Sequence, residues 1–173
     1  YWMDPRNAVQ AARFIAEHLS GTDPENAELY AENAAAVSDA LNTAYDSWHG
    51  QLDGLSCPYL ITFHDGFQYF ADAFGLDLLF AMEEEDGATA SARDILTASQ
   101  LVREYDLPVV FTERNGSGAA AKAVSGETGV RVDTLSMLMD GPDAPEGGAV
   151  AVLHATYLAL MDENITTLAE VLK

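Results

Sequence analysis

Residues 54–173 alternate short apolar runs with helical patterns, and this alternation constrains the fold more than any other feature of the sequence. The apolar runs have the length of buried strands and lie at 59–63, 77–82, 108–112 and 130–135. Patterns typical of helices lie at 67–74, 92–105, 117–126 and 150–172, the last with an expected break near Asn164. Such alternation is typical of parallel strands joined by right-handed crossovers. We therefore predict an α/β fold with a four-stranded parallel sheet and helices on both faces.

The first 53 residues carry a different pattern, which predicts two helices. The first spans 5–19 and follows Asp4, a typical N-cap residue before a proline. The second spans 24–52, where one apolar stripe continues over a length of about 40 Å at 1.5 Å per residue. A helix of that length indicates a backbone shared by two lobes. We therefore divide the chain into residues 1–53, with the two helices, and residues 54–173, an α/β lobe.

The charge of the chain excludes some classes of partner. With 28 acidic and 8 basic residues, the formal net charge is −20, which repels nucleic acid and anionic membranes. Such a surface suits a cation ligand, although solubility in high salt is the simpler explanation. Cys57 is the only cysteine, so the chain has neither a disulfide nor a thiolate metal site, and we interpret Cys57 as a small buried apolar residue.

Chemically active side chains follow the predicted strands. In open parallel sheets, ligands bind beyond the carboxyl ends of the strands. Those ends carry His64 and Asp65, then Glu83–Glu85, then 113–115, and finally Ser136. Imidazole and carboxylate together suit zinc or manganese. The pattern alone leaves two readings of His64, a metal ligand or a hydrogen-bonded residue that closes a buried strand.

The neighbours of His64 also have simpler interpretations. We expect Asp65 to cap the following helix rather than to bind metal. Glu113 either orients a ligand histidine or orders its own loop. The acidic run at 83–87 is interpreted as a solvated loop, since its spacing does not fit a calcium loop. We expect His18 and His49 at the surface, and His154 either to pack against the fold or to face solvent.

An enzyme is not expected from this sequence. Ser136, His64 and an acid could be imagined as a catalytic triad. However, the Gly-x-Ser-x-Gly turn of serine hydrolases does not occur in the chain. We therefore expect a binding protein rather than a hydrolase.

The stretch ITFHDGFQYFADAFGL, at 61–76, resembles a specific segment of the metal-receptor subunits of ABC importers for zinc and manganese. These are the TroA-like substrate-binding proteins with a helical backbone. In their zinc branch the segment reads Phe-His-Asp-Ala-Tyr-x-Tyr-Phe and its histidine is a metal ligand, whereas the manganese branch has a glutamate there. The resemblance implies that His64 is a metal ligand. It favours Zn²⁺ as the ion, with Mn²⁺ as the alternative.

The resemblance continues over nearly the whole chain. The stretch WMDPRNAVQAARF is similar to the family's Trp-x-Asp-Pro helix, VVFTERNGSGAAAKAV to its third strand–helix unit, and TYLALMDENITTLAEVL to its C-terminal helix. The resemblance implies two lobes bridged by the long helix, with the metal in the cleft between them. It also implies a receptor in the periplasm, or otherwise outside the cytoplasm, that hands its ion to a membrane permease.

The resemblance covers only the bridge and the C-terminal lobe. We therefore expect that the N-terminal lobe is absent from this chain, and that the chain is a fragment. In the family another ligand histidine usually stands two residues before the Trp, which would be immediately before Tyr1. An open strand-end face would expose Trp2 and Met3, so we also expect the fragment to form a homodimer through that face.

Some residues depart from the family pattern. Where a fourth ligand exists in the family it is an aspartate after the last strand, and Ser136 stands at that position. Serine is a poor zinc ligand, although water can complete the shell. The alternative function is therefore an α/β interaction lobe that has lost its metal.

Overall fold

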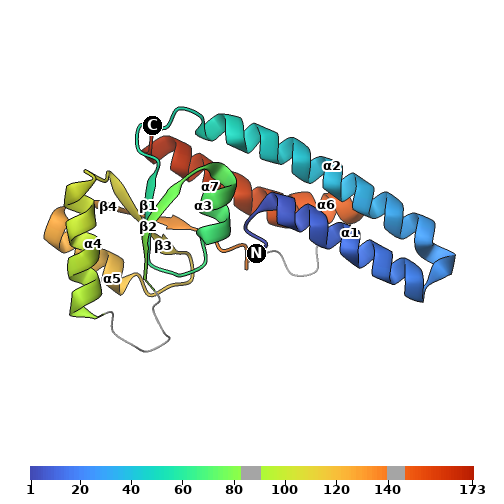
Figure 1. The fold of residues 1–173 in the computed structure, drawn as a ribbon, viewed down its shortest axis with the longest axis horizontal. Helices are drawn as coiled ribbons and strands as arrows, with labels where there is room; N and C mark the ends of the chain where they lie inside the picture. The colour runs from blue at the N-terminus through green and yellow to red at the C-terminus, as the bar shows by residue number, and fades with distance from the viewer. Residues whose placement is uncertain (83–90, 140–146) are drawn as a thin grey trace.

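The structure is a computed structural model that describes residues 1–82, 91–139 and 147–173 (Figure 1). Its helices are α1 (Pro5–Thr22), the 3₁₀ turn η1 (Pro24–Asn26), α2 (Ala27–Leu52), α3 (Gln68–Phe74), α4 (Ala92–Glu104), α5 (Ala119–Thr128), α6 (Ala149–Leu153), the π-helical turn η2 (His154–Leu158) and α7 (Ala159–Val171). Its strands are β1 (Tyr59–Thr62), β2 (Asp77–Ala81), β3 (Val109–Glu113) and β4 (Arg131–Leu135). In the described ranges, no helix is both long and apolar enough to cross a membrane.

The four strands form one parallel sheet in the order β2-β1-β3-β4, which confirms the predicted fold class. The chain leaves β1 toward one edge of the sheet, then returns past β1 to build β3 and β4 on the other side. The direction of the connections therefore reverses between β1 and β3. At such a point the two outgoing loops separate and leave a crevice beyond the strand ends. His64 follows one of these two strands and Arg114 the other.

Helices cover both faces of the sheet because successive strand residues point to opposite sides. Leu60 and Phe111 belong to a cluster under α2, α3 and α7. Ile61 and Val110 belong to a second cluster under α4 and α5. Figure 1 shows α4 and α5 on one side of the sheet, opposite α3 and α7. Two apolar cores thus fix the sheet between the layers and hold the strand ends at one edge.

The predicted long helix is confirmed. α2 runs for 26 residues without a break, about 39 Å at 1.5 Å per residue, after the 3₁₀ turn η1. It packs against α1 as a hairpin that extends away from the sheet (Figure 1). At the turn, the Asp23 carboxylate accepts hydrogen bonds from Asn26 (2.8 Å) and from the hydroxyl of Tyr30 (2.7 Å). These two bonds, that of Asn26 foremost, lower the pKa of Asp23.

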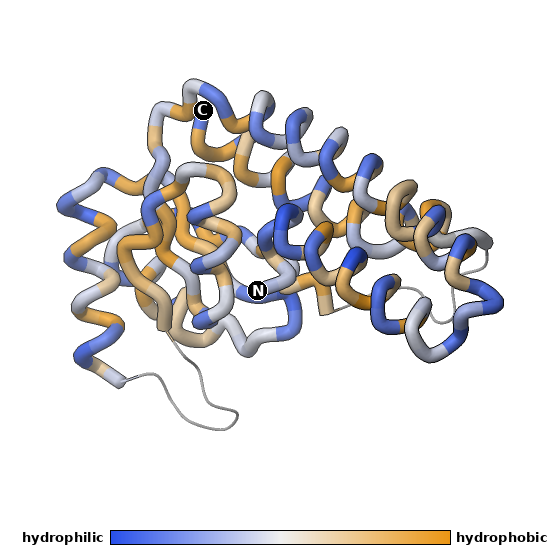
Figure 2. Tube along the Cα trace, turned by 45° about the vertical axis from the view of Figure 1, so that its right-hand side comes forward, coloured by the Kyte–Doolittle hydropathy of each residue, from blue (hydrophilic) through white to orange (hydrophobic). Residues whose placement is uncertain are grey.

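The α1–α2 hairpin keeps apolar side chains at its surface. The tube in Figure 2 shows apolar and polar residues alternating along both helices. The exposed large apolar residues of the hairpin are Phe14, Ile15, Leu19 and Leu29. An apolar groove between α1 and α2, of about 250 Å³, lies beside Ile15 and Leu19.

The expected break near Asn164 is wrong. Asn164 lies within α7, and the irregular turn is η2, which lies closer to the start of the closing helical segment. Asparagine interrupts helices when its amide competes for nearby backbone groups. Here the amide of Asn164 instead bonds the backbone of Ser136 across the fold, so the helix continues through it.

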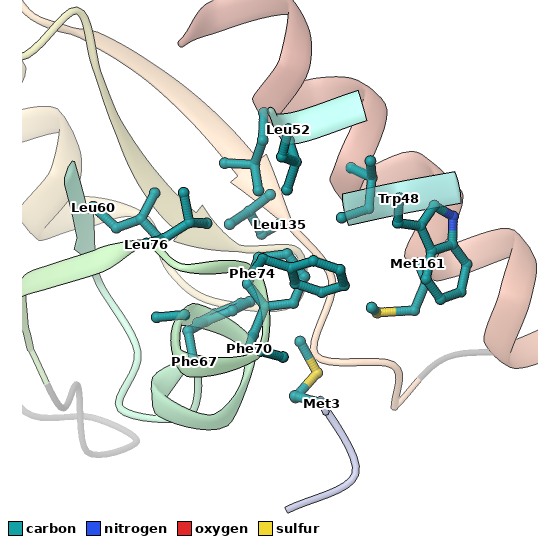
Figure 3. Packing of buried hydrophobic residues seen from close by; sticks show 14 of the residues in the cluster. Met3, Trp48, Leu52, Leu60, Phe67, Phe70, Phe74, Leu76, Leu135 and Met161 are labelled. Atoms are coloured by element: carbon teal, nitrogen blue, oxygen red, sulfur yellow. The ribbon is translucent and has the colours of Figure 1, made fainter. Parts of the chain in front are cut away.

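The expected exposure of Met3 is also wrong. Met3 is 1% exposed, and Figure 3 shows its side chain reaching from the N-terminal segment toward Phe70 and Phe74. Burying a methionine side chain contributes about 1.5–3 kcal/mol relative to leaving it in water. Tyr1 and Trp2, by contrast, remain 56% and 44% exposed. Met3 therefore anchors the N-terminal segment to the core while its aromatic neighbours stay at the surface.

Candidate metal site

The turn after β1 places His64 at the edge of the sheet. The hydroxyl of Thr62 donates a 3.0 Å hydrogen bond to the carbonyl oxygen of His64, which closes the turn. Phe63 and Phe67 on either side are buried in opposite cores, so the short segment between them is fixed at both ends. His64 itself is only partly buried. The turn therefore presents an imidazole at the strand-end surface on a well-anchored backbone.

Gly66 lets the end of β4 approach this turn. A Cβ atom added to Gly66 would lie 2.2 Å from Cε and 2.8 Å from Sδ of Met137, and 3.3 Å from Cδ2 of His64. Carbon atoms in contact normally stand about 3.5–4.0 Å apart. A side chain at position 66 would therefore collide with Met137. Because glycine has no side chain, the Met137 thioether and the His64 ring both lie against Gly66.

The N-terminal segment holds Met137 from the other side. The indole Nε1 of Trp2 donates a 3.0 Å hydrogen bond to the carbonyl oxygen of Met137. The hydroxyl of Tyr157 in turn donates a 2.7 Å bond to the carbonyl oxygen of Trp2. Burial, with a smaller contribution from the charge of Asp4, raises the pKa of Tyr157. Tyr157 therefore stays a protonated donor at any physiological pH.

Ser136 is held by α7. Its backbone N–H donates to Oδ1 of Asn164 (2.7 Å), and the Asn164 amide donates back to the Ser136 carbonyl (2.8 Å). The Ser136 hydroxyl accepts a 3.0 Å bond from the N–H of Leu138. Leu138 has φ of +59°, a left-handed conformation that costs energy for a branched side chain. Ser136 is thus a buried residue that shapes the loop after β4.

The other predicted residues do not gather around His64. The side chain of Asp65 accepts a bond from the side chain of Gln68, and the N-cap residue of α3 is Phe67, so the predicted backbone cap by Asp65 is wrong. The Glu113 carboxylate accepts a 3.1 Å bond from the N–H of Asn115, which is the loop-ordering alternative. Glu83–Glu85 and the rest of the acidic run lie outside the described residues. His18 and His49 are exposed as predicted, and His154 is exposed too, which is the solvent-facing alternative.

The donor set at this edge is small. Across residues 1–82, 91–139 and 147–173, no three His, Cys, Asp or Glu side chains are grouped closely enough to hold a metal ion. His64 offers an imidazole nitrogen, a donor that zinc readily accepts. Met137 offers a thioether beside it, which the sequence reading missed because a methionine after a buried strand is typical of a core residue.

Nearly the whole chain matches the model of a protein family. The family described as zinc-uptake complex component A, periplasmic, matches residues 1–171. The chain belongs to this family. Among its curated relatives is the zinc-binding protein AdcA of Streptococcus pyogenes, which is 28% identical over 169 residues, 96% of this chain and 32% of AdcA. The manganese-binding lipoprotein MntA of Halalkalibacterium halodurans is 26% identical over 168 residues, 96% of this chain and 54% of MntA.

Solved structures of similar proteins share the fold of this member of the zinc-uptake family. The laminin-binding protein Lbp of Streptococcus pyogenes has a TM-score of 0.83 at 28% identity, over 99% of this chain and 64% of Lbp. The Zn(II)-bound H205L variant of AdcAII from Streptococcus pneumoniae has a TM-score of 0.77 at 29% identity, over 99% of this chain and 61% of AdcAII. The chain spans about a third of the length of AdcA and just under two thirds of these solved chains.

Proposed function

We propose that this chain is part of the receptor subunit of an ABC importer, which captures Zn²⁺ and delivers it to a membrane permease outside the cytoplasm. Mn²⁺ is the alternative cargo. The observation that carries the proposal is His64, which stands at the carboxyl end of β1, beside the point where the strand connections reverse. Membership of the zinc-uptake family supports it, as do relatives described as zinc-binding and manganese-binding.

Within this proposal His64 is the metal ligand. Its imidazole is partly exposed and has a fixed backbone, so it can accept an ion without rearrangement of the strand. A tight zinc site needs about four donors, and further ones would come from a second lobe that faces this edge. We accordingly propose residues 1–53 as the interlobe part and residues 54–173 as the C-terminal lobe. The −20 charge favours the approach of any cation.

Zinc titrations of two proteins test the proposal. The chain of 173 residues, titrated against a competing chelator, should show only weak binding. A tight zinc site needs about four donors, and the described residues hold no group of three or more His, Cys, Asp or Glu side chains. The same chain joined to the N-terminal lobe of AdcA should bind zinc tightly and lose that binding on His64→Ala. His154→Ala, which changes an exposed histidine on η2, is the matched control and should bind as the unchanged protein does. Equal zinc affinity with and without His64 would overturn the proposal.

An interaction lobe without metal is the second candidate. It is favoured by Ser136, whose hydroxyl is bonded to Leu138 and whose backbone is bonded to Asn164. Among the described residues 136–139 after β4, none carries a carboxylate. Under this alternative the two-lobed protein would fold normally, yet zinc would neither bind nor raise its melting temperature.

We further propose that the chain alone pairs as a homodimer through the strand-end face. Tyr1 and Trp2 are exposed there, and Tyr1 packs edge-to-face on Tyr69 with ring centroids 5.8 Å apart. A two-fold contact would cover these rings with a second copy of themselves. Because Met3 is buried, the contact would involve Tyr1, Trp2 and Tyr69 rather than Met3.

A further inference from the structure

We propose that Met137 is a specificity-determining residue of the proposed metal site and that its thioether shifts the site toward soft cations. The inference rests on the proposed function, because it assigns a second donor beside His64. The observation is that Sδ and Cε of Met137 and Cδ2 of His64 all lie within 3.3 Å of the point that a Cβ atom on Gly66 would occupy.

The thioether of Met137 is held in place by its backbone. Its carbonyl oxygen accepts the hydrogen bond from Trp2, and its neighbours Ser136 and Leu138 are joined by the 3.0 Å bond to the Ser136 hydroxyl. The side chain is 8% exposed, so it rests against the β1 turn rather than in solvent. A buried methionine with fixed backbone can present sulfur at one place with little loss of rotamer entropy.

The chemistry of sulfur sets the expected preference. Thioether sulfur is a soft donor that suits soft cations, whereas carboxylate and carbonyl oxygen suit Mg²⁺, Ca²⁺ and Mn²⁺. The described start of the loop after β4, residues 136–139, offers a hydroxyl that is already bonded at Ser136, and a sulfur at Met137. An imidazole with a thioether therefore favours zinc and softer ions, such as Cd²⁺, over manganese. The two side chains together would bind less well those ions that prefer oxygen ligands, such as Mn²⁺.

Gly66 is the second residue on which the position of the Met137 thioether depends. Its φ is not in the left-handed region, so an alanine there is free of backbone strain. The added Cβ would collide only with the flexible end of Met137 and come within 3.3 Å of the His64 ring. Gly66→Ala should therefore push the thioether away from His64 without removing the sulfur. This gives a test that is independent of deleting Met137.

Metal titrations of the 173-residue chain measure the preference, with Cd²⁺ and Mn²⁺ as probes. Met137→Leu keeps the volume and removes the sulfur. It should lower the ratio of Cd²⁺ affinity to Mn²⁺ affinity about tenfold. Losses of metal affinity of about ten- to a hundredfold are typical when a residue that supports a metal ligand is changed. Gly66→Ala should lower the ratio similarly, and the double variant should fall no further, because both changes act on the same thioether. The matched control is Met139→Leu, which changes a methionine that is 69% exposed.

Methyl spectra give a direct second readout. With the ε-methyl groups of the five methionines labelled, Cd²⁺ should shift the Met137 signal at the same concentrations that shift the His64 ring signals. An unmoved Met137 signal, or an unchanged affinity ratio in both Met137→Leu and Gly66→Ala, would overturn the inference. If that inference failed but His64→Ala abolished zinc binding, the proposed function would stand without a role for Met137. If Cd²⁺ shifted the Met137 methyl signal while His64→Ala changed the affinity for no metal, the proposed function would fail instead.

Discussion

The indole of Trp2 donates a hydrogen bond of 3.0 Å to the carbonyl oxygen of Met137, which lies 135 residues further along the chain. This bond joins the N-terminal segment to the loop after β4, beside the turn that carries His64. Tyr157 extends the connection from η2 by donating to the Trp2 carbonyl. The edge of the sheet proposed to bind metal is therefore assembled from both ends of the chain.

Trp2→Phe should weaken this connection. The variant keeps an aromatic ring but loses the donor, so we expect the free energy of unfolding to fall by about 1 kcal/mol. Urea denaturation followed by circular dichroism measures the change. Phe14→Leu, at an exposed position of α1, is the control and should stay within about 0.5 kcal/mol. A Trp2→Phe variant as stable as the unchanged chain would show that water replaces the bond at no cost.

Asn164→Ala should be more destabilising. Asn164 is 2% exposed and satisfies both backbone groups of the buried Ser136, at 2.7 and 2.8 Å. Its removal leaves two buried groups without these partners, each costing about 1–3 kcal/mol. We expect a loss of about 3 kcal/mol in urea denaturation. Asn42→Ala on the exposed side of α2 is the matched control and should be neutral or slightly stabilising, because alanine favours helix.

Tyr157 should make the fold sensitive to alkaline pH. Burial raises its pKa in the folded chain above the value of about 10 that a tyrosine has when unfolded. Above pH 10 the unfolded chain thus binds fewer protons than the folded one, and the free energy of unfolding falls as pH rises. Below pH 10 this contribution is fully present.

Tyr157→Phe tests this pH dependence. Urea denaturation between pH 8 and 11 should show a smaller slope in the variant, although its stability at pH 8 is lowered by the lost bond to Trp2. Tyr30→Phe is the control: the pKa of Tyr30 is also raised, by its bond to Asp23, but at a partly exposed position where solvent screens the effect. Equal slopes in the unchanged chain and Tyr157→Phe would contradict the assignment.

Local patterns in the sequence were sufficient to predict the fold class. Alternating residues such as Leu60 and Ile61 serve two separate cores, which is why short continuous apolar runs indicate strands covered on both faces. The position of His64 after β1 followed from the same reasoning. Its role as a metal ligand stays a prediction, since a single imidazole can also serve only structure.

The contacts between distant segments could not be predicted. The approach of Met137 to His64 depends on the missing side chain of Gly66, and periodicity carries no information on which loops touch. The burial of Met3 depends on the path of the N-terminal segment past α3. Asn164 looked like a helix breaker because its partner, Ser136, is 28 residues away. Each of these errors concerns a tertiary contact that outweighs a local preference.

The proposed homodimer should strengthen with salt. Each copy carries a formal charge of −20, so two copies repel at low ionic strength. The Debye length falls from about 30 Å at 0.01 M salt to about 3 Å at 1 M, which removes most of that repulsion but leaves apolar contacts intact. Sedimentation velocity at these two salt concentrations should show mainly monomer in the first and dimer in the second.

Tyr1→Ser together with Trp2→Ser should prevent the dimer at 1 M salt, while Phe14→Ser with Leu29→Ser on the α1–α2 hairpin should not. The reverse result would move the contact to the apolar groove of the hairpin, and monomer under all conditions would show that the strand-end face stays open.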